Sequence, residues 1–284
     1  MPQTGSLGAP FHNVAVATDF FATAAHAVTL ATTVARACAA DLTVVHVVEP
    51  AAYSRIGPDT EALRGVGQAA LDAAVVRVRD DLPSARGALL VGRPAEEVVT
   101  FAETNDVDLI VTATHGRQSV ERWLLGSVAE KILRACHAPV LTVRSAGRPI
   151  RRLLLATDFG PSSEGAVELA ARIAAVFGAR ITLLHALDDD AREPTGEVAR
   201  ATRERLEKVA EGIGGLVPDR DVLVRHGKPW SEICDEAKDG YDLVVLGTHG
   251  RSAVPRWLIG SVAERVVRAA EPPVLTVRGA PRAT

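Results

Sequence analysis

The sequence predicts an α/β protein made of two tandem, doubly wound domains, each a five-stranded parallel sheet with helices on both faces. Two observations predict it. Short apolar runs alternate with longer segments of helical periodicity, and this whole alternation occurs twice within the 284 residues. Runs that are apolar on both faces, and that are joined by crossover helices, are typical of a parallel sheet covered on both sides.

The elements of the first copy follow in order along the chain. Apolar runs predict strands at residues 13–17, 42–48, 88–91, 109–113 and 140–143. Between them, amphipathic segments predict helices at about 22–39, 59–81, 95–104 and 125–136. Right-handed crossovers then give a doubly wound sheet, in which a ligand binds outside the carboxyl ends of the strands where the winding reverses.

The second copy repeats these elements in the same order. VAVATDF at residues 14–20 returns as LLLATDF at 153–159, and LTVVHVV at 42–48 returns as ITLLHAL at 181–187, both at an offset of 139. Later segments recur at offsets of 135 and 134, and 21 of the 31 residues from Thr114 match those from Thr248. We therefore expect a tandem duplication with domains at 1–146 and 147–284. Gly178 is expected to end a helix, with Ala39 as its counterpart.

Composition restricts the class of protein. Lys plus Arg (32) against Asp plus Glu (35) gives a net charge of −3, which offers no electrostatic argument for nucleic acid or an anionic membrane as partner. Three widely spaced cysteines predict reduced thiols and no disulfide framework. No signal peptide or 18-residue uncharged apolar run is evident, so we expect a soluble, cytoplasmic protein.

Aspartates and histidines recur at corresponding positions of the two copies. Asp19 and Asp158 follow the first strand of each copy, where an aspartate serves either as the N-cap of the next helix or as a ligand contact. One carboxylate could do both. His46 and His185 lie within apolar second strands, where a packed, hydrogen-bonded core histidine is expected more often than a catalytic one.

A glycine-containing loop follows the fourth strand of each copy. In the second copy the spacing is Gly247-x-x-Gly250-x9-Gly260-Ser261. A strand-end glycine permits positive φ and close approach to a ligand, and the amides of a helix start suit a phosphate. Ser261 with Glu264, and Ser127 with Glu130, also fit a helix capping box that needs no ligand. Capping alone does not account for the glycines and the nine-residue arc, so the spacing favours a phosphate site.

Other motifs of phosphate, metal and hydrolytic sites are absent from the sequence. There is no Walker-type G-x-x-x-x-G-K-[S/T], no complete G-x-G-x-x-G, no H-E-x-x-H and no G-x-S-x-G. Neither a catalytic residue nor a cluster of metal ligands can be assigned from spacing.

These motifs resemble the nucleotide-binding universal stress proteins. The similarity rests on Gly-x-x-Gly-x9-Gly-Ser between a first strand ending in Thr-Asp-Phe and a last strand Pro-Val-Leu-Thr-Val-Arg. It covers nearly the whole chain as a tandem two-domain member. The resemblance implies a Rossmann-like fold of the adenine nucleotide alpha hydrolase type. It also implies ATP, often with Mg²⁺, bound at the strand ends in the branch that keeps the glycines.

The resemblance also assigns residues to the two sites. In the second copy it places the adenine and ribose at Ala156, Thr157, Asp158 and Ala186, and the ribose and phosphates at Gly247, Gly250, Arg251, Gly260, Ser261 and Val262. In the first copy the corresponding residues are Ala17, Thr18, Asp19, Val47, Gly116, Arg117, Gly126, Ser127 and Val128. That copy departs from the pattern at Ala113, where the family has its first glycine. We expect both sites to bind, with the first as the less certain.

The sequence also gives expectations about the partners and the activity of the protein. The short apolar closing strands at 139–144 and 273–278 resemble the strand through which the family commonly dimerises, which predicts an intrachain pseudo-dimer and further homodimerisation. Three functions stay open: an ATP-binding sensor or regulator with an unknown protein partner, a slow ATPase or adenylyl-transferring enzyme of the same fold, and a nucleotide-independent protein-interaction module.

Overall fold

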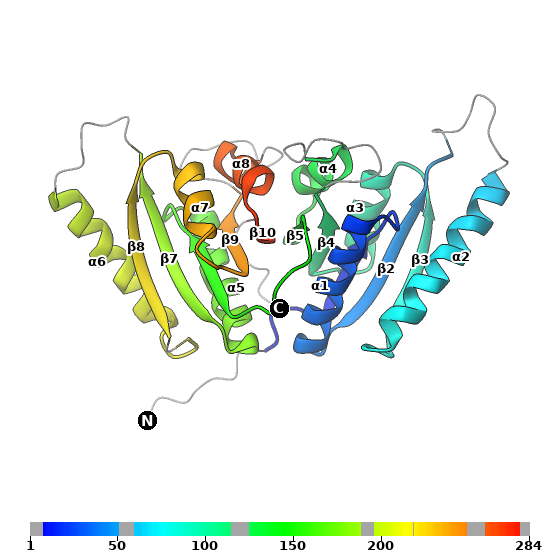
Figure 1. Ribbon diagram of the computed structural model, residues 1–284, viewed down its shortest axis with the longest axis horizontal. Helices are drawn as coiled ribbons and strands as arrows, with labels where there is room; N and C mark the ends of the chain where they lie inside the picture. Colours follow the sequence, from blue (N-terminus) through cyan, green and yellow to red (C-terminus); the bar gives the residue numbers. More distant parts are fainter. Residues whose placement is uncertain are drawn as a thin grey trace. The chain divides into compact units, whose positions relative to one another are not determined.

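The computed structural model describes residues 8–50, 60–114, 125–188, 196–217, 219–248 and 259–278. The chain divides into two compact units (Figure 1). The amino-terminal unit spans Phe11–Gly147, and the carboxyl-terminal unit comprises the chain from Arg148 together with residues 8–10. Each unit is described by itself.

The amino-terminal unit alternates strands and helices along its whole length. Its elements are β1 (Asn13–Ala17), α1 (Ala22–Cys38), β2 (Asp41–Val48), α2 (Thr60–Arg79), β3 (Arg86–Val91), α3 (Pro94–Thr104), β4 (Leu109–Ala113), α4 (Ser127–Ala135) and β5 (Val140–Val143). The strands are parallel, in the order β3-β2-β1-β4-β5. Helix α1 contacts α2 and α3 contacts α4, so each pair covers its own face of the sheet.

The carboxyl-terminal unit repeats this architecture. Its elements are β6 (Arg152–Ala156), α5 (Pro161–Phe177), β7 (Arg180–Leu187), α6 (Gly196–Ile213), β8 (Arg220–His226), α7 (Pro229–Ala237), β9 (Leu243–Gly247), α8 (Ser261–Ala269) and β10 (Val274–Val277). Its strands are also parallel, in the order β10-β9-β6-β7-β8. The predicted fold class, two doubly wound α/β domains in tandem, is confirmed.

Burial explains why the central strands are apolar on both faces. Every residue of β5 and β10 is buried, and four of the five residues in each of β4, β6 and β9 are buried. The outer strands β3 and β8 are only partly covered and are more polar. Two helices end in the left-handed conformation, at Gly178 (φ 60°) as expected and at its counterpart Ala39 (φ 52°).

An aspartate fixes the start of the first strand in each unit. The Asp242 carboxylate accepts hydrogen bonds from the amides of Arg151 (2.9 Å) and Arg152 (3.0 Å). Asp108 accepts in the same way from the backbone amides at 12 (2.7 Å) and 13 (3.0 Å). Each aspartate precedes the fourth strand of its unit, so it sets the register in which that strand meets the first.

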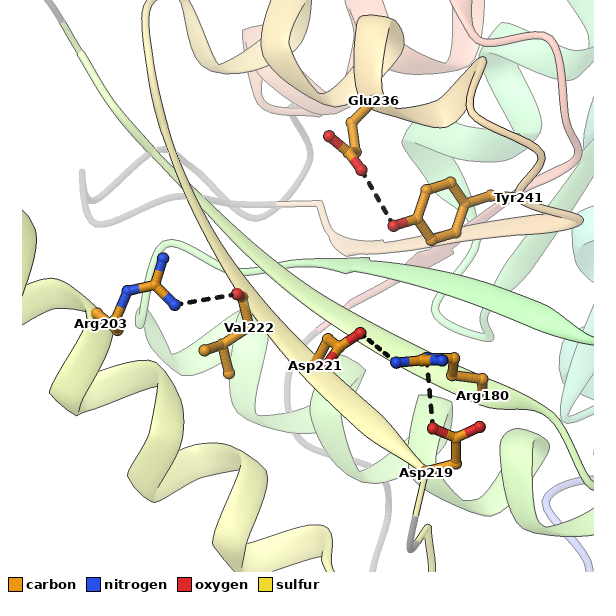
Figure 2. A network of polar contacts seen from close by, with 7 residues as sticks. All are labelled: Arg180, Arg203, Asp219, Asp221, Val222, Glu236 and Tyr241. Carbon is orange, nitrogen blue, oxygen red and sulfur yellow. Dashed lines mark hydrogen bonds and ion pairs between the residues drawn. The ribbon is translucent and has the colours of Figure 1, made fainter.

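The carboxyl-terminal unit contains a polar cluster at positions where the other unit has apolar residues. Figure 2 shows the Tyr241 hydroxyl directed at the buried carboxylate of Glu236, to which it donates a hydrogen bond of 3.1 Å. Arg225 donates to the same carboxylate at 3.1 and 2.5 Å. At an offset of 134, the amino-terminal unit has Ala102 and Val107 in place of Glu236 and Tyr241. The two copies therefore share a fold but stabilise this region differently.

Arg180 crosslinks the amino-terminal ends of two strands. Arg180 begins β7 and pairs with Asp221 of β8 and with Asp219 just before it, the latter at 3.3 Å (Figure 2). Arg203 of α6 donates to the carbonyl of Val222 at 3.5 Å, which joins that helix to β8. These contacts lie toward the amino-terminal ends of the strands, whereas a doubly wound sheet binds its ligand at the carboxyl ends. They therefore stabilise the sheet away from the expected ligand site.

Cys38, Cys136 and Cys234 are all buried and form no disulfide. In the part of the chain that the structure describes, no helix combines the length and apolar character needed to cross a bilayer.

Candidate functional site

The sheet winding reverses between the first and fourth strands of each unit. In the carboxyl-terminal unit β6 pairs with β9, and Ala156 lies opposite Leu246. In the amino-terminal unit β1 pairs with β4, and Val16 lies opposite Val111. Neighbouring strands are about 5 Å apart, so the residues that follow these strands lie close together at the carboxyl ends, where doubly wound sheets form the crevice that binds a ligand.

The turn after β6 is built around Asp158. Its Oδ1 atom accepts hydrogen bonds from the amide of Gly160 (2.9 Å) and from the hydroxyl of Ser163 (2.5 Å). Phe159 adopts a left-handed backbone (φ 61°), which costs a non-glycine residue about 1–2 kcal/mol. The amide of Phe159 donates to Thr157 Oγ1 at 3.0 Å, which helps to stabilise this conformation.

The turn after β1 has the same form with fewer contacts. Asp19 Oδ1 accepts from the amide of Phe21 at 3.1 Å, and Phe20 has φ 65° with its amide donating to Thr18 Oγ1 at 3.0 Å. Of the two alternatives left open for the aspartates, a helix N-cap or a ligand contact, the N-cap is wrong. The N-caps are Phe21 and Gly160, two residues later, because the aspartate first closes a turn onto that residue's amide.

The histidines of the second strands support these turns. His46 Nδ1 lies 2.8 Å from the carbonyl oxygen of Thr18, and His185 Nδ1 lies 2.7 Å from that of Thr157. A carbonyl only accepts, so Nδ1 carries the proton in both contacts. The predicted role as a packed, hydrogen-bonded core histidine is confirmed for His185, which is buried, while His46 makes the same hydrogen bond from a half-buried position.

Aromatic contacts extend this support in both units. The ring of Phe20 lies 4.3 Å from that of His46, and the ring of Phe159 lies 4.7 Å from that of His185. The guanidinium of Arg205, on α6, lies 4.1 Å above Phe159. At an offset of 135 the amino-terminal unit has Ala70 in its place. Nothing in the sequence pattern singled out Arg205, since only the packing of α6 brings it to this turn.

The glycines that start α4 and α8 close the loops before them. Gly126 donates its amide to Thr114 O and Gly260 donates to Thr248 O, both at 2.7 Å. The preceding residues, Leu125 and Ile259, are buried. Both ends of each loop are therefore fixed beside the end of the fourth strand, and the helix that follows begins at the edge of the crevice.

The predicted capping box is wrong in both units. Gly126 and Gly260 are the N-caps, with extended backbone, so Ser127 and Ser261 are the first helical residues and their glutamates come one position too late. Glu264 instead pairs with Arg268 and Glu130 with Arg134, each at 2.9 Å. Ser127 and Ser261 are exposed.

These helix starts are suited to an anion. The first amides of an α-helix have no carbonyl partner within the helix and carry the positive end of its dipole. The N-cap of each helix is glycine, which has no side chain to bond to these amides. Val128 and Val262, in the same first turn, are half-buried. The arrangement provides backbone donors for a phosphate at the crevice edge.

Gly247 has a structural role that its sequence position did not indicate. It does not have positive φ, contrary to the expected reason for a glycine here. A Cβ at this position would lie 2.9 Å from the backbone carbonyl carbon and oxygen of Ser162, in the first turn of α5. The glycine therefore lets β9 approach the α5 backbone closely, whereas Ala113 takes its place at the end of β4.

The remaining predicted residues fall into two groups. Ala17, Thr18, Ala156 and Thr157 lie at the ends of β1 and β6, and Val47 and Ala186 lie near the ends of β2 and β7, where both are half-buried. Within each unit these residues lie on neighbouring strands, β1 beside β2 and β6 beside β7, so their strand ends lie close together. Gly116, Arg117, Gly250 and Arg251 lie outside the described residues. Among the described residues, no three metal-ligating side chains come together.

Comparison with known proteins agrees with this architecture. Residues 10–144 and 149–278 each match the Universal stress protein family. A universal stress protein of Mycolicibacterium smegmatis is 29% identical over 260 residues, covering 84% of this chain and 87% of the relative. Universal stress protein Rv2005c of Mycobacterium tuberculosis is 29% identical over 207 residues, or 69% of each chain.

A solved structure shows the same fold. The crystal structure of a universal stress protein from Archaeoglobus fulgidus superposes with a TM-score of 0.71 at 20% sequence identity, covering 94% of this chain and 98% of the other. Since the two family matches take up nearly the whole length and follow the two structural units, the chain belongs to the universal stress protein family and contains two of its domains in tandem.

Proposed function

We propose that each unit binds ATP at the strand-end crevice, and that the protein acts as a nucleotide-dependent sensor or regulator in stress response. One observation carries the proposal. In each unit an aspartate turn and a helix start with glycine as its N-cap follow neighbouring parallel strands, so a carboxylate and a group of backbone donors occur at the carboxyl ends of the same strand pair.

The chemistry of these groups fits the parts of a nucleotide. Carboxylates accept hydrogen bonds from the hydroxyls of a ribose, and helix-start amides donate to phosphate oxygens. The proposed ribose acceptors are Asp19 and Asp158. The proposed phosphate donors are the first turns of α4 and α8, at Gly126, Ser127, Val128, Gly260, Ser261 and Val262. Val47 and Ala186 offer small apolar contacts for the base.

Mg²⁺ would accompany the phosphates in this proposal. Mg²⁺ prefers octahedral oxygen ligands and usually keeps several waters. Phosphate oxygens and water would supply most of its coordination. The metal would neutralise phosphate charge, while the chain itself holds the nucleotide.

A binding role suits the aspartates better than a role as catalytic base. Asp158 already accepts two hydrogen bonds on one oxygen and Asp19 accepts one, so both carboxylates already act as hydrogen-bond acceptors within their turns. A slow ATPase or adenylyl transfer remains the second candidate, because the same carboxylates could support metal-assisted chemistry. A nucleotide-independent interaction module is the third.

Calorimetric titration of the full chain with MgATP tests the proposal. We expect two sites per chain in the wild type and one in either Gly126→Val or Gly260→Val, because the added side chain covers the helix-start amides. Gly65→Val and Gly212→Val are matched controls, since the structure has no atom within 4 Å of a Cβ at either glycine. No binding by the wild type, or unchanged stoichiometry in both site variants, would overturn it.

Two measurements separate the alternatives. ADP or AMP release above a no-protein control, lost in Asp158→Ala, would favour the enzyme. Absence of any nucleotide from denatured purified protein, examined by mass spectrometry, together with no ATP binding, would favour the interaction module. The pairing of the closing strands, homodimerisation, the protein partner and the cellular location stay predictions.

A further inference from the structure

Ser163 is joined to Asp158 in both directions. Its hydroxyl donates to Asp158 Oδ1 at 2.5 Å and accepts from the Asp158 amide at 3.3 Å. Ser163 is 4% exposed and lies in the first turn of α5. With the Gly160 amide on the same oxygen, the carboxylate is held from two directions. This leaves Asp158 little rotational freedom before any ligand arrives.

The amino-terminal unit lacks this hydroxyl. The offset of 139 that aligns Asp158 with Asp19 aligns Ser163 with Ala24. Ala24 is also buried, at 2% exposure, so the position is enclosed in both units but polar in only one. Among the described residues, Asp19 has one hydrogen bond to its carboxylate, from the Phe21 amide at 3.1 Å. Its orientation is therefore less restricted.

The same helical turn also touches the start of the glycine-containing loop. A Cβ at Gly247 would meet the backbone of Ser162, the residue before Ser163, at 2.9 Å. Pro161 fixes the first position of the helix. The end of β9 therefore contacts the first turn of α5, which in turn contacts the Asp158 carboxylate through Ser163. The glycine allows β9 and α5 to lie this close together.

We propose that Ser163 is a positioning residue that pre-orients Asp158 for the vicinal hydroxyls of a ribose, and that it makes the carboxyl-terminal site the tighter of the two. The inference rests on the proposed nucleotide function. A carboxylate that rotates freely loses conformational entropy when the ligand binds, which weakens the affinity. A carboxylate that hydrogen bonds already hold does not lose this entropy on binding. Immobilising one such side chain corresponds to about 3- to 10-fold in affinity.

The binding test uses full chains in which one site remains. In a Gly126→Val background, Ser163→Ala is expected to weaken MgATP binding about 3- to 10-fold. Ser162→Ala is the matched control, because it removes a neighbouring hydroxyl and keeps the Cβ. In a Gly260→Val background, Ala24→Ser is expected to tighten binding at the other site by a similar factor, a gain that a purely structural role would not give.

A nucleotide-free measurement separates this inference from the proposed function. Amide hydrogen exchange of Gly160, followed by NMR, should be about 10-fold faster in Ser163→Ala than in Ser162→Ala, because its acceptor is no longer held. If ATP does not bind the wild type, the proposed function fails while this exchange still tests the contact. Unchanged affinity in Ser163→Ala, or no gain in Ala24→Ser, or unchanged Gly160 exchange would each overturn the inference.

Discussion

The Nδ1 atom of His185 lies 2.7 Å from the carbonyl oxygen of Thr157, the residue immediately before Asp158. The histidine belongs to β7 and the threonine follows β6, so this hydrogen bond ties the Asp158 turn to the neighbouring strand. His46 and Thr18 make the equivalent contact at 2.8 Å. The aspartate turns of both units are thus fixed by a side chain that belongs to the core.

Replacing His185 should weaken the carboxyl-terminal unit. His185→Phe keeps an aromatic ring beside Phe159 but leaves the buried Thr157 carbonyl without this donor. We expect a loss of about 1–3 kcal/mol in the free energy of unfolding, measured by urea denaturation. His226→Phe is the control, because His226 is exposed at the end of β8. Equal losses in the two variants would contradict the assigned role.

Gly247→Ala should destabilise although alanine is the residue found at position 113. The new Cβ would lie 2.9 Å from the Ser162 backbone, and the helix must shift to accommodate it. Overpacking of this kind costs about 1–3 kcal/mol. Gly212→Ala makes the same change in α6, where no atom lies within 4 Å, and should be stabilising by up to about 1 kcal/mol.

Thermal unfolding of the two variants compares these effects. Opposite signs of the change in Tm are expected. A neutral or stabilising Gly247→Ala would show that the packing of α5 does not require the glycine. The close contact between the end of β9 and the first turn of α5 would then not be a constraint on Asp158.

Removing the Glu236 carboxylate should destabilise the region shown in Figure 2. Glu236 is 7% exposed on its side chain and accepts from both Arg225 and Tyr241, whereas the Arg225 side chain is 42% exposed. Solvent screening of the arginine limits the loss in Glu236→Ala to about 1.5–3 kcal/mol. Chemical denaturation measures it, with Asp235→Ala on the exposed side of α7 as control. A loss no larger than in the control would exclude a stabilising role.

Tyr241 should make stability depend on alkaline pH. Burial raises the pKa of its phenol above the ordinary 10.0, and the neighbouring Glu236 charge raises it further. Folding therefore favours the neutral phenol. The contribution of this phenol to the free energy of unfolding is complete below pH 10.0 and is lost as the pH rises through the raised pKa. In Tyr241→Phe the free energy of unfolding should fall less steeply above pH 10.0. Identical slopes would contradict this.

Arg172 should hold the segment before Phe11 against α5. Its guanidinium donates to the carbonyls of Gly8 (3.0 Å) and Ala9 (2.5 Å). Arg172→Ala removes both bonds, and we expect faster limited proteolysis ahead of Phe11. Arg172→Lys should protect only partly, since lysine lacks the planar fork. Arg200→Ala, on the exposed side of α6, is the control, and equal cleavage rates in Arg172→Ala and this control would contradict the contact.

The sequence predicted most strands within two residues, because residues buried on both faces must be apolar. It also predicted that a helix ends at Gly178, with Ala39 as its counterpart, and that the aspartates follow the first strands. The capping box failed for a physical reason. The Ser-x-x-Glu spacing is satisfied, but the chain stays extended through Gly126 and Gly260, which moves each serine into the helix.

By itself the sequence determined the α/β class, the duplication and the family, since these depend on periodicity and on repeated order along the chain. Only the tertiary structure decided what individual groups contact. Gly247 meets Ser162 and Arg205 covers Phe159 because elements from distant parts of the chain pack there. Ser163 holds Asp158 because the intervening turn brings the first turn of α5 back to the carboxylate. Such contacts depend on the direction in which side chains leave packed elements, and spacing along the chain does not contain that information.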